Sequence, residues 1–361
     1  MSQRIRIKDI AEETGVSIGT VDRVIHNRGH VAAEVRERVL QAMEKLGYEP
    51  NILARMLANN RVLRIAAILP DYRQDQYWVQ PKEGAEKAAA AAEHYGVRVE
   101  FHFFKIFDAA DFQQKAREAL STAPNALLVA PLFRREGEAL LLEAAERGVG
   151  VVTINTNLEG AECLCYIGQE SYQSGVLAGR LLNFELNDGD HAMVLNLDKA
   201  VTNARHLLDK EKGFRDFFTG VHDKSVTVYY EVFEDFDDPS ALRAWMAGQL
   251  EQTPRLTGIF VTNSRAYKLV DALDDKLLRR IKIVGFDLVE PNLHYLGENK
   301  IQFLINQNAW HQGYLGIMAI VNHLILNKEI GRHQYLPLDI VVRENVEYYL
   351  ARTLELPMAA V

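Results

Sequence analysis

Nine apolar runs of strand length occur between Leu63 and Gln307, and they constrain the fold more than any other feature of the chain. They are LRIAAILP, VRVEFHFFK, NALLVAP, GVVTIN, HAMVLNL, VTVYYEVFE, GIFVT, IKIVGFD and IQFLINQ. Amphipathic stretches such as PKEGAEKAAAAAEHYG and DFQQKAREALSTA separate most of them. Strands that are apolar on both faces and linked by helices form parallel β-α-β units. So many units predict an α/β body of two doubly wound lobes rather than one sheet.

The first sixty residues show three helix patterns and no strand pattern. IKDIAEETG has apolar residues at helical spacing and stops at Gly15. Ser17 is placed to cap the next helix, IGTVDRVIHN, and a third apolar repeat in AAEVRERVLQAMEKLGY continues to Leu46. Two short helices joined by a glycine-containing turn and braced by a third are typical of a helix-turn-helix domain.

The charge of the chain is divided unevenly between these two regions. Through Arg64 there are 11 Lys and Arg against 8 Asp and Glu, whereas the remainder of the 361 residues has 30 against 41. A small basic head therefore precedes a large acidic body. The net charge of -8 argues against a general nucleic-acid coat. No run of 18 apolar residues and no signal-peptide pattern occurs, so we expect a cytoplasmic protein without a membrane partner.

No motif of the chain points to an enzyme, a metal or a cofactor. Cys163 and Cys165 form a C-x-C pair in ECLCYIG, but no His or Cys follows at the spacing of a zinc site. Two buried thiols in a reducing compartment are the simpler interpretation. A G-x-S-x-G elbow, a P-loop, H-E-x-x-H and G-x-G-x-x-G are all missing from the sequence. We therefore expect no catalytic site, no metal and no cofactor.

An ordered series of motifs in the head resembles the LacI/GalR family of bacterial transcription regulators. The segment IKDIAEETGVSIGTVDRVIHNRGHVAAEVRERVLQAMEKLGYEPNILARMLA follows the family pattern in register, and the body resembles a ribose-binding-protein-like effector domain of the type I periplasmic-binding-protein kind. The resemblance implies an all-α head at 1–49, a hinge helix and linker at 50–62, and an effector-binding and dimerisation domain at 63–361. Lobe 1 of that domain is expected at about 63–168 and 308–336, and lobe 2 at about 169–307 and 337–361.

The resemblance implies which side chains of the second helix meet DNA. Ile18 and Gly19 occupy the positions that family members vary to choose bases, and Arg23 matches an arginine that reaches a base edge, where guanine is its commonest partner. Ser17 and Thr20 match donors to phosphates, which fix register rather than sequence. The simpler alternatives are a solvated arginine at 23 and a plain helix cap at 17.

Asp22 departs from the family, which usually has serine at that position. A carboxylate cannot donate to a phosphate, so we predict that Asp22 accepts from a cytosine amino group or orients Arg23 or Arg28. The alternative is that Asp22 lies at a solvated edge, where its repulsion of the DNA phosphates is tolerated. His30, close to the same helix, is expected beside a phosphate or on plain surface.

The segment NILARMLANN matches the family's hinge helix. The resemblance implies that Asn51, Ala54 and Leu57 of two chains enter the minor groove of a bent palindromic operator, with the leucines wedged into a central base step. Ten residues are marginal as an isolated helix, so this segment is expected to order on a partner. Packing of Leu57 against the body is the alternative.

In the body, DYRQDQYWVQ places Asp75, Tyr77 and Trp78 in the family's polar and paired-aromatic segment. The resemblance implies that the aromatics sandwich a sugar ring, whose C–H faces are apolar and whose rim is hydroxylated. The alternative for the two aromatic residues is simple core packing.

Four polar residues at expected strand ends match the family's cleft residues, namely Asn155, Asn263, Asp287 and Gln307. Carboxyl ends of strands are where doubly wound sheets bind ligands. Capping of the following helix is the alternative at each position, because Asn and Asp are good caps.

Lys210 marks a departure from the sugar-binding relatives. They carry an arginine shortly before a G-F pair, whereas NARHLLDKEKGF offers Leu208 and Lys210 at the nearest equivalents, with Arg205 offset. Lysine lacks the planar fork of arginine, which puts bidentate hydroxyl recognition in doubt. A pentose- or hexose-like effector is favoured, and a modified, acidic or phosphorylated sugar stays open.

Together these features predict a repressor whose operator affinity is controlled by a small effector. We expect a dimer, because an operator read by so small a head needs two half-sites. A soluble sugar-binding receptor without a DNA role is the alternative, but it leaves the head unexplained. The Ala-rich PKEGAEKAAAAAEHYG is a candidate dimer surface, although such a helix packs equally well inside. ARTLELPMAAV lacks the leucine heptads that would join two dimers.

Overall fold

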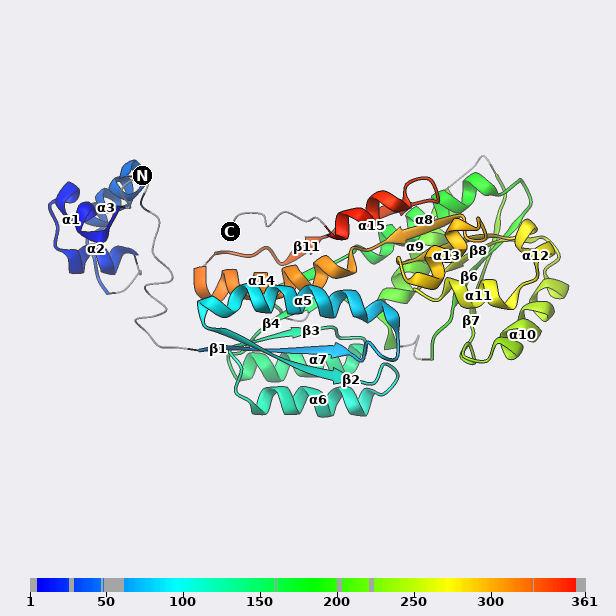
Figure 1. Cartoon of the computed structure of the whole chain (residues 1–361), viewed down its shortest axis with the longest axis horizontal. Helices are drawn as coiled ribbons and strands as arrows, with labels where there is room; N and C mark the ends of the chain where they lie inside the picture. The colour runs from blue at the N-terminus through cyan, green and yellow to red at the C-terminus, as the bar shows by residue number, and fades with distance from the viewer. Residues whose placement is uncertain are drawn as a thin grey trace. The chain divides into compact units, whose positions relative to one another are not determined.

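The computed structural model describes residues 5–25, 29–46, 48, 62–158, 160, 162–199, 203–220, 224–326 and 328–354. The chain divides after Arg61 into two compact units, a helical head and an α/β body (Figure 1). The hinge residues Asn51, Ala54 and Leu57 lie outside the described residues, so their roles stay predictions.

The head contains α1 (Ile7–Thr14), α2 (Ile18–Ile25) and α3 (Ala33–Leu46). The first helix ends as its sequence indicates, because Gly15 takes the left-handed conformation (φ 68°) and donates its N–H to the carbonyl of Ala11. Ile10, Val21 and Val39, one from each helix, are fully buried and pack into one core. The predicted helix-turn-helix head is confirmed.

Lobe 1 of the body is a six-stranded parallel sheet in the order β11-β5-β4-β3-β1-β2. Helices α5 and α14 cover one face, and α6 and α7 cover the other (Figure 1). The strands are β1 (Leu63–Pro70), β2 (Val97–Phe104), β3 (Ala126–Val129), β4 (Gly150–Ile154), β5 (Cys165–Gly168) and β11 (His333–Tyr335). The helices are η1 (Gln76–Trp78), α5 (Val79–Ala92), η2 (Glu93–Tyr95), α6 (Ala109–Ser121), α7 (Arg134–Glu146) and α14 (Ala309–Leu326).

Lobe 2 is a second six-stranded sheet in the order β12-β10-β9-β8-β6-β7, in which only β12 runs antiparallel to its neighbour. Apolar side chains of α8 and α9 pack on one face, and those of α10, α11 and α12 pack on the other. The strands are β6 (His191–Asn196), β7 (Thr227–Val232), β8 (Leu256–Val261), β9 (Lys282–Phe286), β10 (Phe303–Asn306) and β12 (Asp339–Val341). The helices are α8 (Ser171–Glu185), α9 (Arg205–Gly220), α10 (Pro239–Gln252), α11 (Ala266–Ala272), α12 (Asp275–Arg280), α13 (Glu290–Gly297) and α15 (Val346–Leu354).

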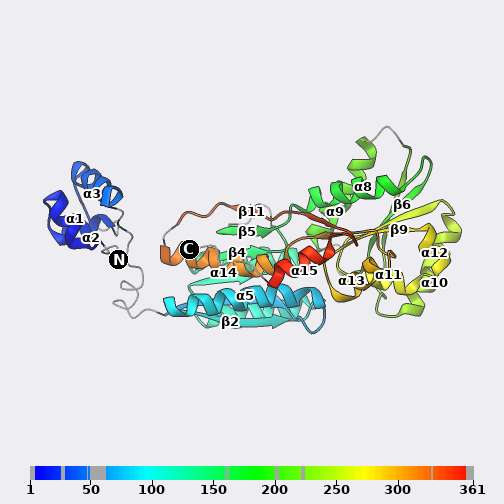
Figure 2. The ribbon, with the colours of Figure 1, turned by 45° about the horizontal axis from the view of Figure 1, so that its top comes forward.

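The chain passes between the lobes three times within the described part of the body: from β5 to α8, from β10 to α14 and from β11 to β12 (Figure 2). Each lobe is therefore built from separate pieces of sequence. None of the described helices is both long and apolar enough to cross a membrane.

All nine apolar runs predicted from the sequence form strands, which confirms the α/β body of two doubly wound lobes. β1, for example, covers LRIAAILP completely, and its residues from Ile65 to Pro70 are buried. The structure adds β5, which lies in the segment ECLCYIG, and the three-residue strands β11 and β12.

Glycines bring two pairs of helices unusually close together. An added Cβ at Gly84 of α5 would collide with the backbone of Trp310 in α14, and one at Gly313 of α14 would collide with that of Pro81. In lobe 2, Gly175 of α8 faces the backbone of Lys210 in α9 in the same way. The small-residue face of the Ala-rich segment thus packs inside lobe 1, and its role in a dimer stays a prediction.

Candidate functional site

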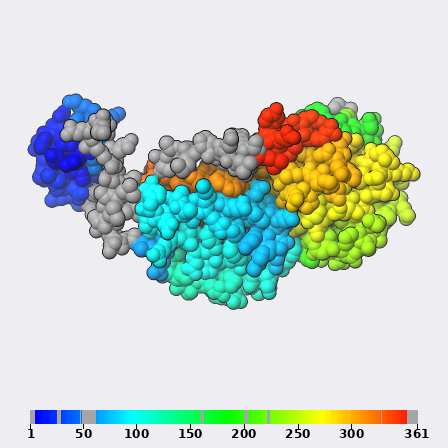
Figure 3. Space-filling model, in the orientation of Figure 1, coloured from blue at the N-terminus to red at the C-terminus, as the bar shows by residue number. Residues whose placement is uncertain are grey.

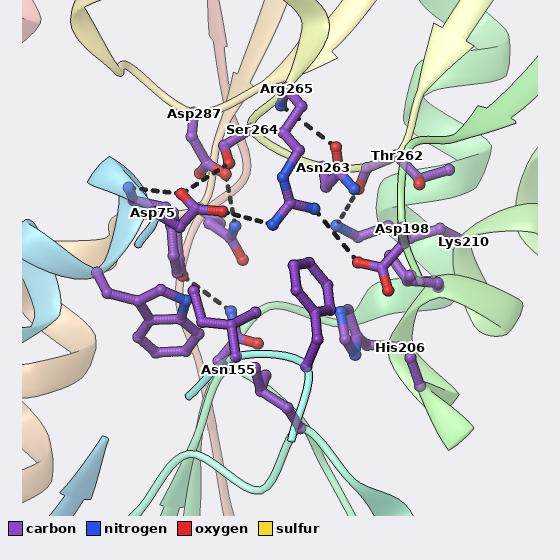
Figure 4. A pocket seen from close by; sticks show the side chains of 18 of the residues that line it. Asp75, Asn155, Asp198, His206, Lys210, Thr262, Asn263, Ser264, Arg265 and Asp287 are labelled. Carbon is purple, nitrogen blue, oxygen red and sulfur yellow. Dashed lines mark hydrogen bonds and ion pairs between the residues drawn. The ribbon is translucent and has the colours of Figure 1, made fainter. Parts of the chain in front are cut away.

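A small hollow, partly open to solvent, lies between the lobes where the carboxyl ends of their strands meet (Figure 4). In Figure 3 the surfaces of the two lobes abut on the face shown. All eight residues predicted for the effector line this hollow: Asp75, Tyr77, Trp78, Asn155, Lys210, Asn263, Asp287 and Gln307. The lining also includes polar groups that the sequence analysis missed, namely Asp198, His206, Thr262, Ser264 and Arg265.

The aromatic wall comes from η1, directly after β1. The carboxylate of Asp75 caps this short helix by accepting from the backbone N–H of Tyr77 at 3.0 Å. The rings of Tyr77 and Trp78 meet edge to face with their centres 4.9 Å apart, and both are buried. They line the hollow and pack into the lobe at the same time, so the two interpretations of these residues are compatible.

Asn155 directly follows β4 and is hydrogen-bonded to the aromatic wall. Its backbone is left-handed (φ 66°), and its side-chain N–H donates to the Tyr77 hydroxyl at 2.9 Å. The next residue, Thr156, lies 3.2 Å from Nδ1 of His206 in lobe 2, a hydrogen bond across the hollow. Burial, and then the nearby charge of Lys210, lower the pKa of His206 to about 3, so this imidazole is neutral at physiological pH.

Asp287 follows β9, also has a left-handed backbone (φ 68°), and does not cap the following helix α13, whose N-cap residue is Val289. Its Oδ2 accepts from the amide of Gln307 at 2.9 Å, and Gln307 in turn accepts from Gln169 at 2.6 Å. Oδ1 of Asp287 is buried and makes no hydrogen bond within the described residues. Because a buried carboxylate oxygen without a partner is costly, this atom is available to accept from a ligand hydroxyl.

Lys210 reaches the floor of the hollow from α9 and is 2% exposed. Its ammonium donates to the carbonyl of Thr262 at 2.8 Å and lies 3.6 Å from the ring centre of Phe286. Burial lowers the pKa of Lys210 and raises the pKa of Asp287, while the attraction between the two groups opposes both shifts. Of the positions the sequence offered, Lys210 lines the hollow, whereas Arg205 pairs with Asp209.

Asn263, Ser264 and Arg265 follow β8 in lobe 2. The Asn263 side chain accepts from the Arg265 N–H at 3.2 Å and donates to the carbonyl of Leu197 at 3.1 Å, so it both lines the hollow and stabilises the local turn. Arg265 extends across the hollow and forms an ion pair with Asp75 at 2.7 Å. The hollow therefore contains an arginine, but it follows β8 and does not lie near the G-F pair.

The lining is suited to binding a small polyhydroxylated molecule. It combines aromatic faces with amides and carboxylates, which are the groups that sugar rings require. Its two cations are matched by carboxylates, since Arg265 pairs with Asp75 and Asp198 and the Lys210 charge is attracted to Asp287. An additional negative charge on the ligand would therefore find no uncompensated cation among these side chains.

In the head, α2 presents the predicted DNA-facing residues on its outer side. Ile18, Gly19 and Arg23 are exposed, with Ile18 at 57%, whereas Val21 and Val24 face the core. The Ser17 hydroxyl accepts from the backbone N–H of Thr20 at 3.1 Å and lies 2.9 Å from its hydroxyl, so Ser17 caps the helix as expected. Asp22 is half-buried beside Arg23, and His30 is exposed. Contacts of these seven positions (Ser17, Ile18, Gly19, Thr20, Asp22, Arg23 and His30) with DNA stay predictions.

Comparison with known proteins identifies both parts of the chain. Residues 6–51 match the family model "Bacterial regulatory proteins, lacI family", and residues 65–329, more than half of the chain, match "Periplasmic binding protein domain". The HTH-type transcriptional regulator RegA of Clostridium saccharobutylicum is 44% identical over 80 residues, which are 22% of this chain and 24% of RegA. The chain thus spans about a quarter of that relative's length in the match.

Two solved structures resemble the body. A candidate LacI transcriptional regulator from Bacteroides fragilis superposes with a TM-score of 0.73 at 23% identity, over 80% of this chain and all of that one. An ABC transporter solute binding protein from Agrobacterium vitis, solved with alpha-D-tagatopyranose, gives 0.69 at 24% identity over 80% and 98%. These likenesses show the fold. The family match over more than half of the chain shows that the body is a periplasmic binding protein domain, and the head carries the lacI-family pattern at residues 6–51.

Proposed function

We propose that this protein is a sequence-specific DNA-binding transcription regulator, a repressor, whose operator affinity is controlled by a small effector bound between the lobes. One observation carries the proposal: a single chain joins a helix-turn-helix head with an exposed Arg23 helix to a body whose hollow is lined by all eight predicted effector residues. The HTH-type regulator name of RegA supports the same function. A soluble receptor without a DNA role is less favoured because it leaves the head without a purpose.

The protein would act as a homodimer on a palindromic operator in the cytoplasm, where bacterial DNA lies. A single α2 of eight residues reads too few bases for useful specificity, so two half-sites are needed. An effector that binds one arrangement of the lobes better than another shifts the dimer toward that arrangement, and operator affinity changes by the same coupling free energy. No step of this mechanism requires a chemical reaction.

The effector class that the hollow favours is an uncharged pentose or hexose. The sugar bound to the Agrobacterium vitis protein is of this kind. Arg265 already pairs with two carboxylates and the charge of Lys210 is attracted to Asp287, so a phosphorylated sugar would add two negative charges to a hollow with little free positive charge. A thermal-shift screen of free sugars beside their phosphates tests this preference, since a ligand at 100 times its dissociation constant stabilises by about 2.7 kcal/mol.

DNA binding is tested by selecting a palindromic site from a random library and measuring the Arg23→Ala variant on it. Loss of an arginine contact to guanine removes about 1–3 kcal/mol of discrimination. Arg38→Ala, at an exposed position of α3, is the matched control and should retain the preference for the selected site. Undiminished site preference in Arg23→Ala would reject the role of Arg23, and failure to select any site would reject the function.

A further inference from the structure

The guanidinium of Arg265 lies where the two lobes meet (Figure 4). It belongs to lobe 2, at the residue that precedes α11, and its Nη2 is 2.7 Å from Oδ2 of Asp75 in lobe 1. Its Nη1 donates within lobe 2, to the carbonyl of Leu197 at 2.9 Å and to Asp198 at 3.3 Å. One planar group therefore holds a carboxylate from each lobe.

Two phenylalanines reinforce this arrangement, one from each lobe. Phe107 follows β2 in lobe 1, Phe236 follows β7 in lobe 2, and their ring centres are 6.0 Å apart. The Arg265 guanidinium carbon is 5.4 Å from the first ring centre and 4.9 Å from the second. Cations are attracted to aromatic faces at such distances. Lobe 1 thus contributes both an ion pair and a ring to a side chain of lobe 2.

These charges are shielded from solvent. The side chains of Arg265, Asp75 and Asp198 are 10%, 12% and 16% exposed. Removing one partner of a shielded, hydrogen-bonded pair leaves the other charge without compensation, which costs far more than losing a surface ion pair. Opening the lobes would separate Asp75 from Arg265 but would leave Asp198 beside it.

We propose that Arg265 is the positioning residue that holds the lobes closed in the absence of effector and thereby sets effector affinity. The eight effector residues come from both lobes, so only the closed arrangement presents them together. Apparent affinity scales with the fraction of molecules in that arrangement. The effect on effector affinity rests on the proposed function, whereas the effect on lobe closure does not.

Two conservative variants separate this role from ordinary stabilisation of lobe 2. Asp75→Asn removes the charge across the lobes and keeps Oδ1, which caps η1. Asp198→Asn removes a charge from the same guanidinium but within lobe 2. Arg265→Gln removes both pairs, and Arg215→Gln, which breaks a pair inside α9 whose arginine is 55% exposed, is the matched control.

The experiment measures lobe separation in the full chain without effector or DNA. Fluorescent labels on non-natural amino acids at the exposed positions Gln113 of α6 and Gln252 of α10 report the distance between lobes by energy transfer. An excess of unlabelled protein confines each label pair to one chain. Wild type, Asp198→Asn and Arg215→Gln should populate the short distance. Asp75→Asn and Arg265→Gln should raise the open fraction by about tenfold or more.

An unchanged distance distribution in both Asp75→Asn and Arg265→Gln would overturn the proposal. So would equal opening in Asp198→Asn, because that result would assign the effect to lobe 2 alone. Circular dichroism of each variant establishes that it is folded. Since no sugar or operator is present, a failure here is distinct from a failure of the proposed regulatory function.

Discussion

The close contact of α8 with α9 makes Gly213→Ala a demanding test of the packing described above. An added Cβ would collide with the carbonyl oxygen of Tyr172, and would lie 2.9 Å from its carbonyl carbon and 3.0 Å from the backbone nitrogen of Val176. Ordinary contacts between non-bonded heavy atoms are about 3.5–4.0 Å, so the helices must separate by about 1 Å or more. Because Gly175 faces the backbone of Lys210, such a displacement also moves the effector-facing lysine.

The expected magnitude follows from two opposing terms. Overpacking a dense interior costs about 1–3 kcal/mol, and replacing glycine by alanine within a helix returns up to about 1 kcal/mol. Gly248, inside α10, has no atom within 4 Å of its added Cβ, so Gly248→Ala should show the gain alone. The two variants should differ in the free energy of unfolding by about 1–3 kcal/mol, with Gly213→Ala the less stable.

Urea unfolding followed by tryptophan fluorescence provides the assay, because Trp78, Trp245 and Trp310 all lie in the body. A lower midpoint with an unchanged slope reports a change in stability rather than in the surface exposed. If Gly213→Ala were as stable as Gly248→Ala, the helices would not be constrained by that glycine, and the reasoning from close approach would be refuted.

Three further predictions concern single side chains. Ser17→Ala should destabilise the head by about 1 kcal/mol in thermal melts, since it removes the cap on α2. Asp22→Ser should tighten binding to random DNA in mobility shifts, because a hydroxyl does not repel phosphates. The same change should weaken the preference for the selected site. Equal gains in affinity for random and selected DNA would exclude base readout by Asp22. Because the pKa of His206 is lower in the folded than in the unfolded chain, the unfolded chain binds a proton at His206 at higher pH. The free energy of unfolding of the wild type should therefore fall as pH drops from about 6.5 toward 3, by up to about 1.4 kcal/mol per pH unit. His206→Gln should flatten that slope in urea titrations at pH 7 and 5, and an unchanged slope would show that His206 is not its source.

The sequence predicted the parts of the fold that local pattern determines. β1 is a continuous apolar run and was located to the residue, whereas β11 is three exposed residues, His333–Tyr335. That strand exists because its backbone pairs with β5, more than 160 positions earlier in the chain. No periodicity in a three-residue segment records such pairing, so β11 and β12 became visible only in the structure.

The residues of the candidate site also differ in whether the local sequence pattern reveals them. Asn155, Asp287 and Gln307 are polar residues that end apolar runs, a signal that parallel sheets make readable. Arg265 carries no comparable signal, because its significance depends on Asp75, which is 190 residues away. The only local hint was its place two residues after Asn263, at the end of a predicted strand.

Because the chain passes between the lobes three times, each lobe is completed late in synthesis. Lobe 1 has its first five strands by Gly168 but lacks α14 until Leu326, and its sixth strand ends at Tyr335. Lobe 2 waits for β12, which ends at Val341. Neither sheet is complete before these late strands have been synthesised, so the apolar face that α14 covers stays uncovered long after the first five strands of lobe 1 have left the ribosome. The head, by contrast, has its own core and its last helix ends at Leu46, so its folding does not require the body to be synthesised.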